Sequence, residues 1–312
     1  MRVVSLGSGS SGNALLVEAG PNGRTKLLID AGFSERILRE RLRSVGVSIS
    51  QIQGILITHE HADHILGLAT IMKRYATPVI ADPRTLAAIE QTLSSGILRS
   101  ESGTLVSLET VTGIDAIEHI VVGDMSNSHS ISDNSIDLII GTRYILGDIE
   151  VVSFPVSHDA VAPCGYLLSA GGCRVCLVTD SGEVTSAMIE AMNQADLLIL
   201  ESNHDRERLL RGPYPYALKQ RILSSTGHLS NDQAAEAVLR TWRTDAVRWL
   251  WLSHLSRTNN TPKIALQSMR ARIQSAKGNL GQIHISVLPQ TMGAIWDSTQ
   301  LWHAPSLWEM QL

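Results

Sequence analysis

Residues 54–68, GILITHEHADHILGL, crowd five ionisable side chains into six positions directly after an apolar run. These side chains are His59, Glu60, His61, Asp63 and His64. Imidazole nitrogens and carboxylate oxygens bind first-row divalent metals, and a tight turn after a strand lets alternate side chains face different points. Without a cation the same groups would desolvate or repel one another, which disfavours the alternative of a polar turn that caps a helix. The pattern therefore predicts a centre for two metal ions.

Histidines and acids also follow four other apolar runs that are far apart in the chain. These residues are His158, Asp180, Glu201 and His254. Ligands of open α/β sheets gather at the carboxyl edge of the strands. We therefore expect these side chains to converge on the first cluster.

The secondary structure that must position these residues is predicted to be that of a layered α/β protein, because short apolar runs alternate with segments of helical periodicity. The 312 residues, 44% apolar and 18% charged, predict one large domain, 1–312, with a real core. Residues 90–148 are rich in turn formers and predict either a hairpin-rich insertion or a lid. The C-terminal segment AIWDSTQLWHAPSLWEMQL holds three tryptophans that could pack on the core or on another subunit.

Two segments beside the ionisable residues have helical periodicity. HILGLATIMKRYAT follows His64, and SNDQAAEAVLRTW has Ser230 as its N-cap with Gln233 completing a capping box. His228 stands just before the second helix, where the first backbone amides favour an anion such as phosphate.

Charge and cysteine content exclude some classes of protein. The net charge of −4 differs from the strongly positive charge that is typical of nucleic-acid-binding domains. A polyanion would therefore have to be bound locally, by a metal centre or a short basic patch. The chain has three cysteines, Cys164, Cys173 and Cys176, an odd number that does not indicate a set of disulfide bonds. We expect them to be buried apolar residues rather than ligands of a zinc site. The N-terminus lacks a signal-peptide core and no apolar window is long enough to span a membrane, so a cytoplasmic, soluble protein is expected.

Several pieces of the chain, in order, resemble metallo-β-lactamase-fold hydrolases and, more narrowly, the YycJ (WalJ) group of predicted DNA exonucleases. The pieces are SLGSGSSGN, LLIDAG, THEHADH, FPVSHDAVAPCGY, VTDSG, LILESNHD, GHLSN and SHLSRTNN, within residues 5–260. The resemblance implies a four-layer αββα sandwich with its active site along one edge of two facing sheets.

The resemblance also implies a role for each metal ligand. One metal would be bound by His59, His61 and His158, the other by Asp63, His64 and His254, with Asp180 bridging and Asp30 holding the ligand loop. Zn, Mn or Fe all accept these ligands, with Zn or Mn favoured. A hydroxide bridging the two cations would attack the phosphorus.

A proton must still reach the leaving oxygen, and Glu201 with His228 is the expected general-acid pair. GHLSNDQAAEA and LILESNHD resemble the corresponding motifs of RNase Z and β-CASP nucleases. A carboxylate beside the imidazole would orient the ring and favour its protonated form. The predicted catalytic residues are therefore His228, Glu201 and Asp63, while a strand-end salt bridge is the structural alternative for Glu201.

Substrate contacts are predicted at Asn13, His204 and Arg206, with the alternative that His204 only closes a turn. The run DRERLLRGPYPYALKQR, residues 205–221, offers arginines for phosphates and tyrosines for bases, although a solvated amphipathic helix explains it equally well. His119, His129, His284 and His303 are expected to be ordinary surface or core residues.

The leading hypothesis is a metal-dependent phosphodiesterase acting on nucleic acid, with DNA favoured over RNA, and most simply a DNA exonuclease. The alternatives are a small-molecule hydrolase of the same fold, for a lactone, thioester or cyclic phosphodiester, and a non-catalytic binding scaffold. The oligomeric state, including a homodimer, is left open by the sequence.

Overall fold

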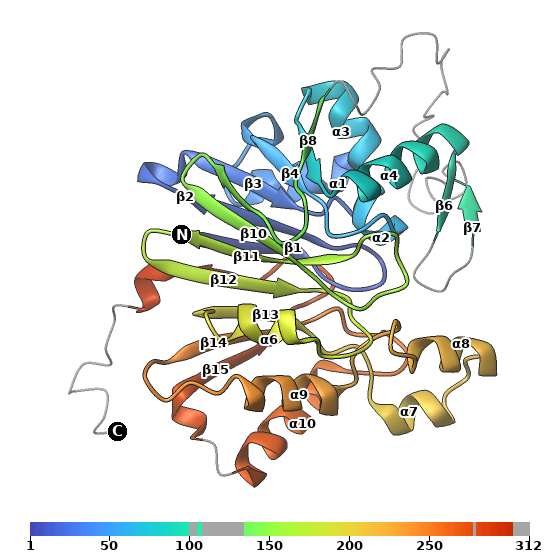
Figure 1. The fold of residues 1–312 in the computed structure, drawn as a ribbon, viewed down its shortest axis with the longest axis vertical. Helices are drawn as coiled ribbons and strands as arrows, with labels where there is room; N and C mark the ends of the chain where they lie inside the picture. Colours follow the sequence, from blue (N-terminus) through green and yellow to red (C-terminus); the bar gives the residue numbers. More distant parts are fainter. Residues whose placement is uncertain (100–104, 108–133, 277–278, 302–312) are drawn as a thin grey trace.

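A computed structural model describes residues 1–99, 105–107, 134–276 and 279–301, and its main feature is a pair of facing β-sheets (Figure 1). The first sheet has seven strands in the order β16-β1-β2-β3-β4-β5-β8. Their bounds are β1 Arg2–Gly7, β2 Ala14–Ala19, β3 Thr25–Ile29, β4 Gly54–Leu56, β5 Val79–Ala81, β8 Ser135–Asp137 and β16 Ile295–Asp297. Antiparallel strands form one half of this sheet, and β3, β4, β5 and β8 run parallel in the other.

The second sheet also has seven strands, in the order β15-β14-β13-β12-β11-β10-β9. Their bounds are β9 Arg143–Leu146, β10 Ile149–Pro155, β11 Cys164–Ala170, β12 Cys173–Val178, β13 Leu197–Glu201, β14 Arg248–Ser253 and β15 Ile283–Val287. β12 to β15 are parallel neighbours, so the chain segments that follow β12, β13 and β14 leave the sheet at one edge. This is the edge at which the sequence places Asp180, Glu201 and His254.

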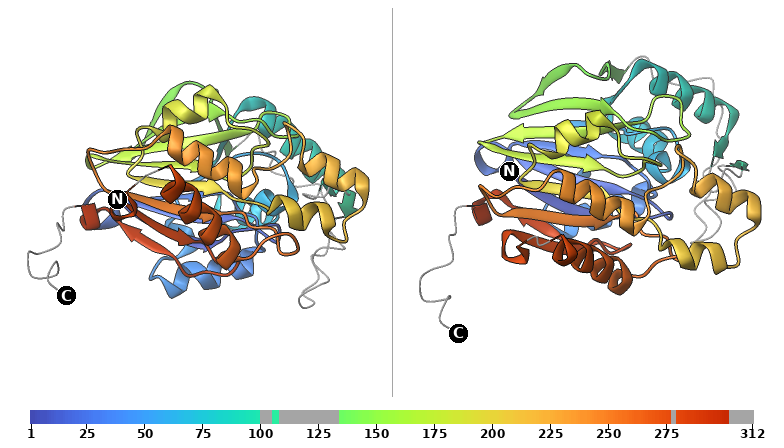
Figure 2. Two further views of the ribbon diagram at one scale, coloured as in Figure 1. Left: turned by 90° about the horizontal axis from the view of Figure 1, so that it is seen from below. Right: turned by 60° about the horizontal axis from the view of Figure 1, so that its bottom comes forward.

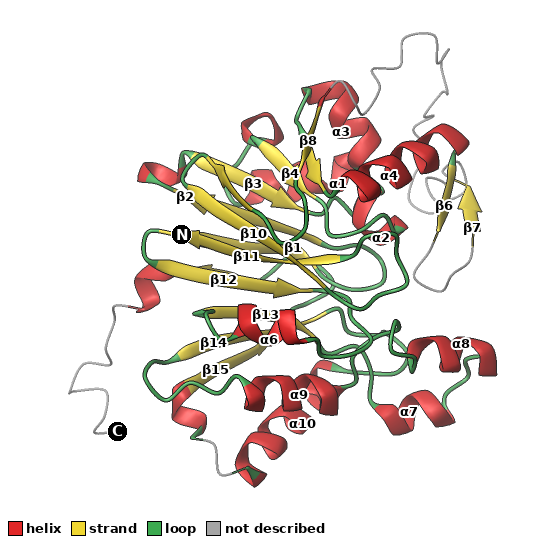
Figure 3. Cartoon of the chain, viewed as in Figure 1, coloured by secondary structure: helices red, strands yellow, loops and turns green. Residues whose placement is uncertain are grey.

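Helices cover the outer face of each sheet, which gives four layers (Figure 3). On the first sheet, α1 (Glu35–Ser44), α3 (Leu68–Tyr75) and α4 (Pro83–Ser95) share an apolar cluster with the strands. On the second sheet, α6 (Ser186–Met192), α9 (Asn231–Arg240) and α10 (Pro262–Ser275) do the same. The predicted αββα sandwich is confirmed.

A third apolar cluster lies between the sheets and contains side chains from both. Its largest fully buried members are Trp296 of β16 and Tyr166 of β11, 1% and 0% exposed. The Tyr166 hydroxyl donates to the Ile57 carbonyl oxygen at 2.6 Å, which satisfies its polar end and ties the second sheet to the chain just after β4. Of the three C-terminal tryptophans, Trp296 therefore packs in the core, while Trp302 and Trp308 lie outside the described residues.

Both predicted helical segments are helical, with differences at their ends. Ser230 and Gln233 form the expected capping box of α9, but the helix ends at Arg240, so Trp242 lies beyond it. The segment after His64 is divided into α2 (Ala62–Ile65) and α3, and Gly67 is the N-cap residue of the second piece.

Residues 90–148 contain the end of α4, a hairpin of β6 (Ile97–Arg99) and β7 (Leu105–Ser107), and strands β8 and β9. Residues 108–133 lie outside the described part, so an insertion or lid stays a prediction, as does the single domain 1–312. His119, His129 and His303 also lie outside it.

Two further sequence predictions concern burial and the membrane. All three cysteines are free and buried, two of them in β12, as expected for structural residues. No helix in the described ranges is long and apolar enough to span a bilayer. A cytoplasmic location stays a prediction.

Candidate metal centre and its proton-donor pair

The candidate site is assembled from loops of both sheets. His59 and His61 lie in the connection from β4 into α2, and Asp63 and His64 lie in α2 itself. His158, Asp180 and His254 follow β10, β12 and β14, and Glu201 ends β13. Two of the turns are unusual, because Asp30 and His254 have φ of 59° and 53°, a left-handed conformation that non-glycine residues adopt at a cost.

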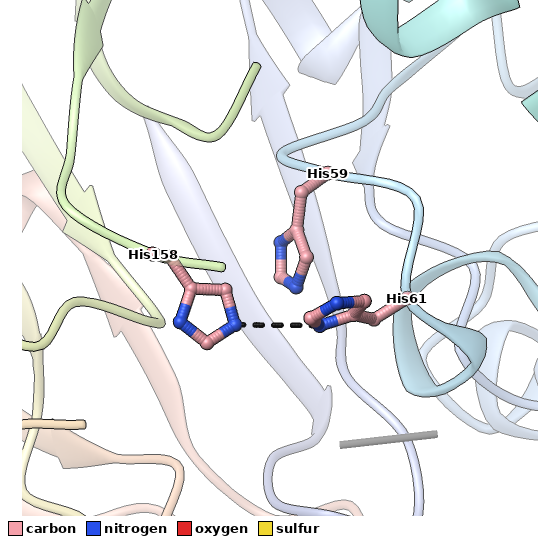
Figure 4. A group of neighbouring side chains, drawn as sticks. All are labelled: His59, His61 and His158. Atoms are coloured by element: carbon pink, nitrogen blue, oxygen red, sulfur yellow. Dashed lines mark hydrogen bonds between the residues drawn. The ribbon is translucent and has the colours of Figure 1, made fainter. Parts of the chain in front are cut away.

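The first donor group contains three imidazoles that point toward one another (Figure 4). His59, His61 and His158 each offer one ring nitrogen, and these atoms lie within 4.8 Å of one another. His158 Nε2 is 3.3 Å from His61 Nδ1. All three residues are at most 5% exposed. The set matches the one predicted for the first metal.

The second donor group contains Asp63, His64 and His254. Asp63 Oδ2 is 3.4 Å from His64 Nε2 and 3.3 Å from His254 Nε2. Asp180 lies between the groups, since its Oδ2 is 3.3 Å from His64 Nε2 and its Oδ1 is 3.1 Å from His254 Nδ1. It also forms a donor set with His59 and His64. This is the position that a bridging ligand requires.

Several donor atoms are buried without a hydrogen-bond partner among the described residues. They are His59 Nε2, His61 Nε2, Asp63 Oδ1 and Asp180 Oδ2. Buried polar atoms are normally paired, because an unpaired one costs on the order of 1–3 kcal/mol. A divalent cation would satisfy imidazole nitrogens and carboxylate oxygens together, so the residues fit a metal centre.

Metal ligands must be neutral imidazoles and ionised carboxylates. Five of the seven predicted ligands have pKa shifts in that direction. His64 differs, because the neighbouring carboxylates, Asp30 first among them, outweigh burial and raise its pKa well above the usual range. Burial and neighbouring imidazoles hold the pKa of His59 well below its usual range, and burial with His158 lowers the pKa of His61 to about 3. Burial likewise lowers the pKa of His158. For Asp63 and Asp180, burial alone would raise the pKa, but the adjacent histidines outweigh it and hold both pKa values well below the usual range.

Residues behind the donors hold them in place. Asp30 accepts hydrogen bonds from the Thr58 backbone N–H at 2.9 Å and lies 2.8 Å from His64 Nδ1. This agrees with the expected supporting role of Asp30. The sequence did not predict a role for Thr58. Its position directly before His59 is the sequence feature that could have indicated one. The Ser8 hydroxyl accepts from the His254 N–H at 2.9 Å and supports that left-handed turn.

Glu201 and His228 form a buried pair next to the donors. His228 Nδ1 is 2.7 Å from Glu201 Oε1, and the residues are 2% and 0% exposed. Glu201 Oε2 accepts from the backbone N–H groups of Ser181 at 2.9 Å and Leu229 at 3.1 Å. Burial would raise the pKa of Glu201, but His228 and His254 lower it overall, so the carboxylate is ionised. The centroid of the His228 ring is 5.0 Å from that of the His158 ring, so the Glu201–His228 pair lies next to the first donor group.

The residues predicted to contact substrate differ in their surroundings. Asn13 is buried, and its Nδ2 is 3.1 Å from Asp63 Oδ2 and from His64 Nε2, so it contacts the ligands themselves. His204 is 1% exposed, both its ring nitrogens are unpaired among the described residues, and burial lowers its pKa to about 4. Arg206 is exposed at the start of α7 (Arg206–Arg211). His284 is exposed and packs on the Trp249 ring, as expected for a surface residue.

Comparison with known proteins gives concordant matches. Residues 25–250 match the family model described as a beta-lactamase superfamily domain. The chain is 33% identical over 277 residues to the exodeoxyribonuclease YycJ of Bacillus anthracis, which covers 89% of this chain and 90% of the relative. It is 34% identical over 276 residues to the exodeoxyribonuclease WalJ of Streptococcus pneumoniae, which covers 88% and 89%. Among solved structures, the metallo-beta-lactamase fold protein YhfI of Bacillus subtilis has a TM-score of 0.60 at 15% identity, over 95% of this chain and 99% of that one.

Proposed function

The chain belongs to the β-lactamase superfamily and to its YycJ-like group, and from this membership we propose that it is a metal-dependent exodeoxyribonuclease. At the coarser level it is a metal-dependent hydrolase. The observation that carries the nuclease proposal is the buried Glu201–His228 pair, with Nδ1 and Oε1 2.7 Å apart, directly beside the metal donors. Acyl-transfer hydrolases need the metals but not a proton donor at this place.

The proposed cofactors are two divalent metal ions, with Zn or Mn favoured and Fe third. His59, His61 and His158 would hold one ion, Asp63, His64 and His254 the other, and Asp180 would contact both. When bound, such a pair makes water acidic enough to act as a nucleophile and neutralises charge on the phosphoryl group.

The chain's own residues would then manage protons and orientation. The carboxylate of Glu201 holds Nδ1 of His228, which leaves Nε2 of the same ring to give a proton to the departing sugar oxygen. Asp63 Oδ1 has no hydrogen-bond partner in the part of the chain that the structure describes, and we assign that oxygen to accept a proton from the attacking water. Asn13 orients Asp63 from behind, so its contribution to substrate binding would be indirect.

The proposed substrate is DNA rather than RNA, which rests on the exodeoxyribonuclease relatives. The test is to incubate the protein with Mn²⁺ or Zn²⁺ and end-labelled single- and double-stranded DNA and RNA, beside a lactone and a thioester. We expect DNA to be degraded to mononucleotides from one end. An Asp180→Asn variant serves as the control, because it removes the charge of the residue between the two donor groups.

Other outcomes would replace the proposal. Consumption of the lactone or thioester alone would indicate a small-molecule hydrolase. No turnover with any metal, together with substoichiometric metal by mass spectrometry, would indicate a binding scaffold. Degradation of RNA in preference to DNA would correct the substrate class while keeping the Glu201–His228 pair.

A further inference from the structure

The segment between Glu201 and His228 leaves the sheet as two short helices, α7 and α8 (Tyr216–Ile222), which project past the sheets on the side of α2 (Figures 1 and 2). We call residues 206–222 the α7–α8 arm. Backbone hydrogen bonds hold both ends of this arm, and the one at its C-terminal end involves His228 of the candidate site. The Asp205 N–H donates to the Asn259 carbonyl oxygen at 2.9 Å, and the His228 N–H donates to the Ile222 carbonyl oxygen at 3.0 Å.

The arm is basic within an acidic protein. It carries five of the 26 Lys and Arg residues and one of the 30 Asp and Glu residues, so it has a formal charge of +4 and the rest of the chain −8. Its cations are Arg206, Arg208, Arg211, Lys219 and Arg221. A local positive field of this kind attracts a polyanion even though the whole chain is negative.

Two of these cations are available for a ligand. Arg211 lies 3.6 Å from Glu207, and Arg221 pairs with Asp159 at 2.7 Å. In the described part of the chain, Arg206 and Arg208 are exposed and have no carboxylate partner. Both belong to α7, which begins five residues after the Glu201 carboxylate. Phosphate oxygens are the partners that guanidinium groups bind most specifically.

The arm also exposes apolar surface that solvation does not explain. Tyr216 is 76% exposed and Leu210 is 49% exposed, among the described residues. A helix that served only solubility would place polar side chains at these positions. Exposed arginines and an exposed aromatic ring on the same arm are the side-chain types that bind phosphates and stack on bases when a single strand is bound.

We infer that the α7–α8 arm is the surface on which a nucleic-acid strand docks, with backbone phosphates on Arg206 and Arg208 and a base on Tyr216. This inference rests on the proposed nuclease function and names where its substrate is held. Because the arm has a formal charge of +4, we favour a polyanion as its ligand over an uncharged protein surface. Because the arm is bonded to the backbone of His228, a strand held on it is delivered to the proton-donor pair.

The test compares the double variant Arg206→Gln/Arg208→Gln with Arg174→Gln/Arg240→Gln. The control arginines are exposed as well, but Arg174 is the second residue of β12, at the end of that strand away from Asp180, and Arg240 ends α9. For single-stranded DNA at about 0.15 M salt we expect KM to rise about tenfold or more in the arm variant only. The slope of log affinity against log salt should fall by roughly 1.4, since each lost phosphate contact on a single strand contributes about 0.7.

Further readouts separate docking from catalysis. The kcat on saturating DNA and the turnover of bis(p-nitrophenyl) phosphate should stay within about twofold of wild type in the arm variant. Tyr216→Ser should weaken single-stranded DNA binding about tenfold and leave the salt slope unchanged. Equal KM and salt slope in the arm variant and wild type would overturn the docking surface alone. A wild-type protein that neither binds nor cleaves nucleic acid would overturn the nuclease proposal as well.

Discussion

Removing the His228 imidazole should separate cleavage of DNA from cleavage of activated phosphodiesters. The variant His228→Ala lacks the ring that we propose as proton donor to the leaving oxygen. A sugar alkoxide leaves poorly without a proton, whereas p-nitrophenolate is stable as an anion. We therefore expect a large loss of rate on DNA and a loss of less than about tenfold on bis(p-nitrophenyl) phosphate.

The expected size follows from the contacts of Glu201. Its Oε1 would lose the 2.7 Å contact to His228 but keep His254 Nδ1 at 3.2 Å, and its Oε2 keeps two backbone N–H donors. The buried carboxylate thus stays satisfied, and the metal donors keep their support. General-acid catalysis contributes typically 10²–10⁴ in rate, so kcat on DNA should fall by that factor, about 3–5 kcal/mol in activation free energy.

The assay measures kcat for both substrates with Mn²⁺, and metal content by mass spectrometry. His284→Ala is the matched control, because it removes an exposed imidazole of β15 that packs on the Trp249 ring. The control should keep wild-type rates on both substrates. Loss of bound metal in His228→Ala, or equal losses of rate on DNA and on the aryl ester, would refute the assignment of His228 as proton donor.

Three further predictions concern support and stability. Asp30→Asn should weaken metal binding about 10–100-fold in chelator competition, since Asp30 orients His64, and unchanged affinity would contradict this role. Native Cys164 should resist alkylation at pH 8 and react after denaturation, because burial raises the pKa of its thiol to about 12, and rapid native labelling would oppose this. Ser230→Ala should lower the free energy of unfolding by about 0.5–2 kcal/mol in denaturant titration through loss of the α9 cap, whereas an unchanged midpoint would exclude it.

Most residues of the candidate site could be found from the sequence because they stand shortly after an apolar strand, whereas His228 was found from its place before the capping box of α9. That signal is local, so it needs only the order of residue types around His59, His158, Asp180 and His254. The division into two metal sets came from resemblance to a family, and both sets recur among the donor groups of the described residues. The geometry also brings Asp180, Glu201, His228 and His254 close enough to form a donor group, which the sequence did not predict. Their role as ligands stays a proposal.

What the sequence could not supply are contacts between segments with no local signal. Ser8 and His254 are 246 positions apart, and nothing near either residue predicts the hydrogen bond between them. Asn13 was expected to face substrate, but the packing of its loop on α2 turns the amide toward Asp63 and His64. The pairing of β1 with β16, which joins the two ends of the described chain, is equally non-local.

The two turns with positive φ, at Asp30 and His254, have a consequence for metal exchange. The first lies behind the donors of the β4–α2 connection, and the second carries a donor of the other sheet. Folding therefore imposes these backbone conformations, and a cation meets a rigid template that it need not reshape. Ions of similar radius could replace one another here without rearranging the polypeptide, so the occupant in a living cell would follow the local supply of each metal.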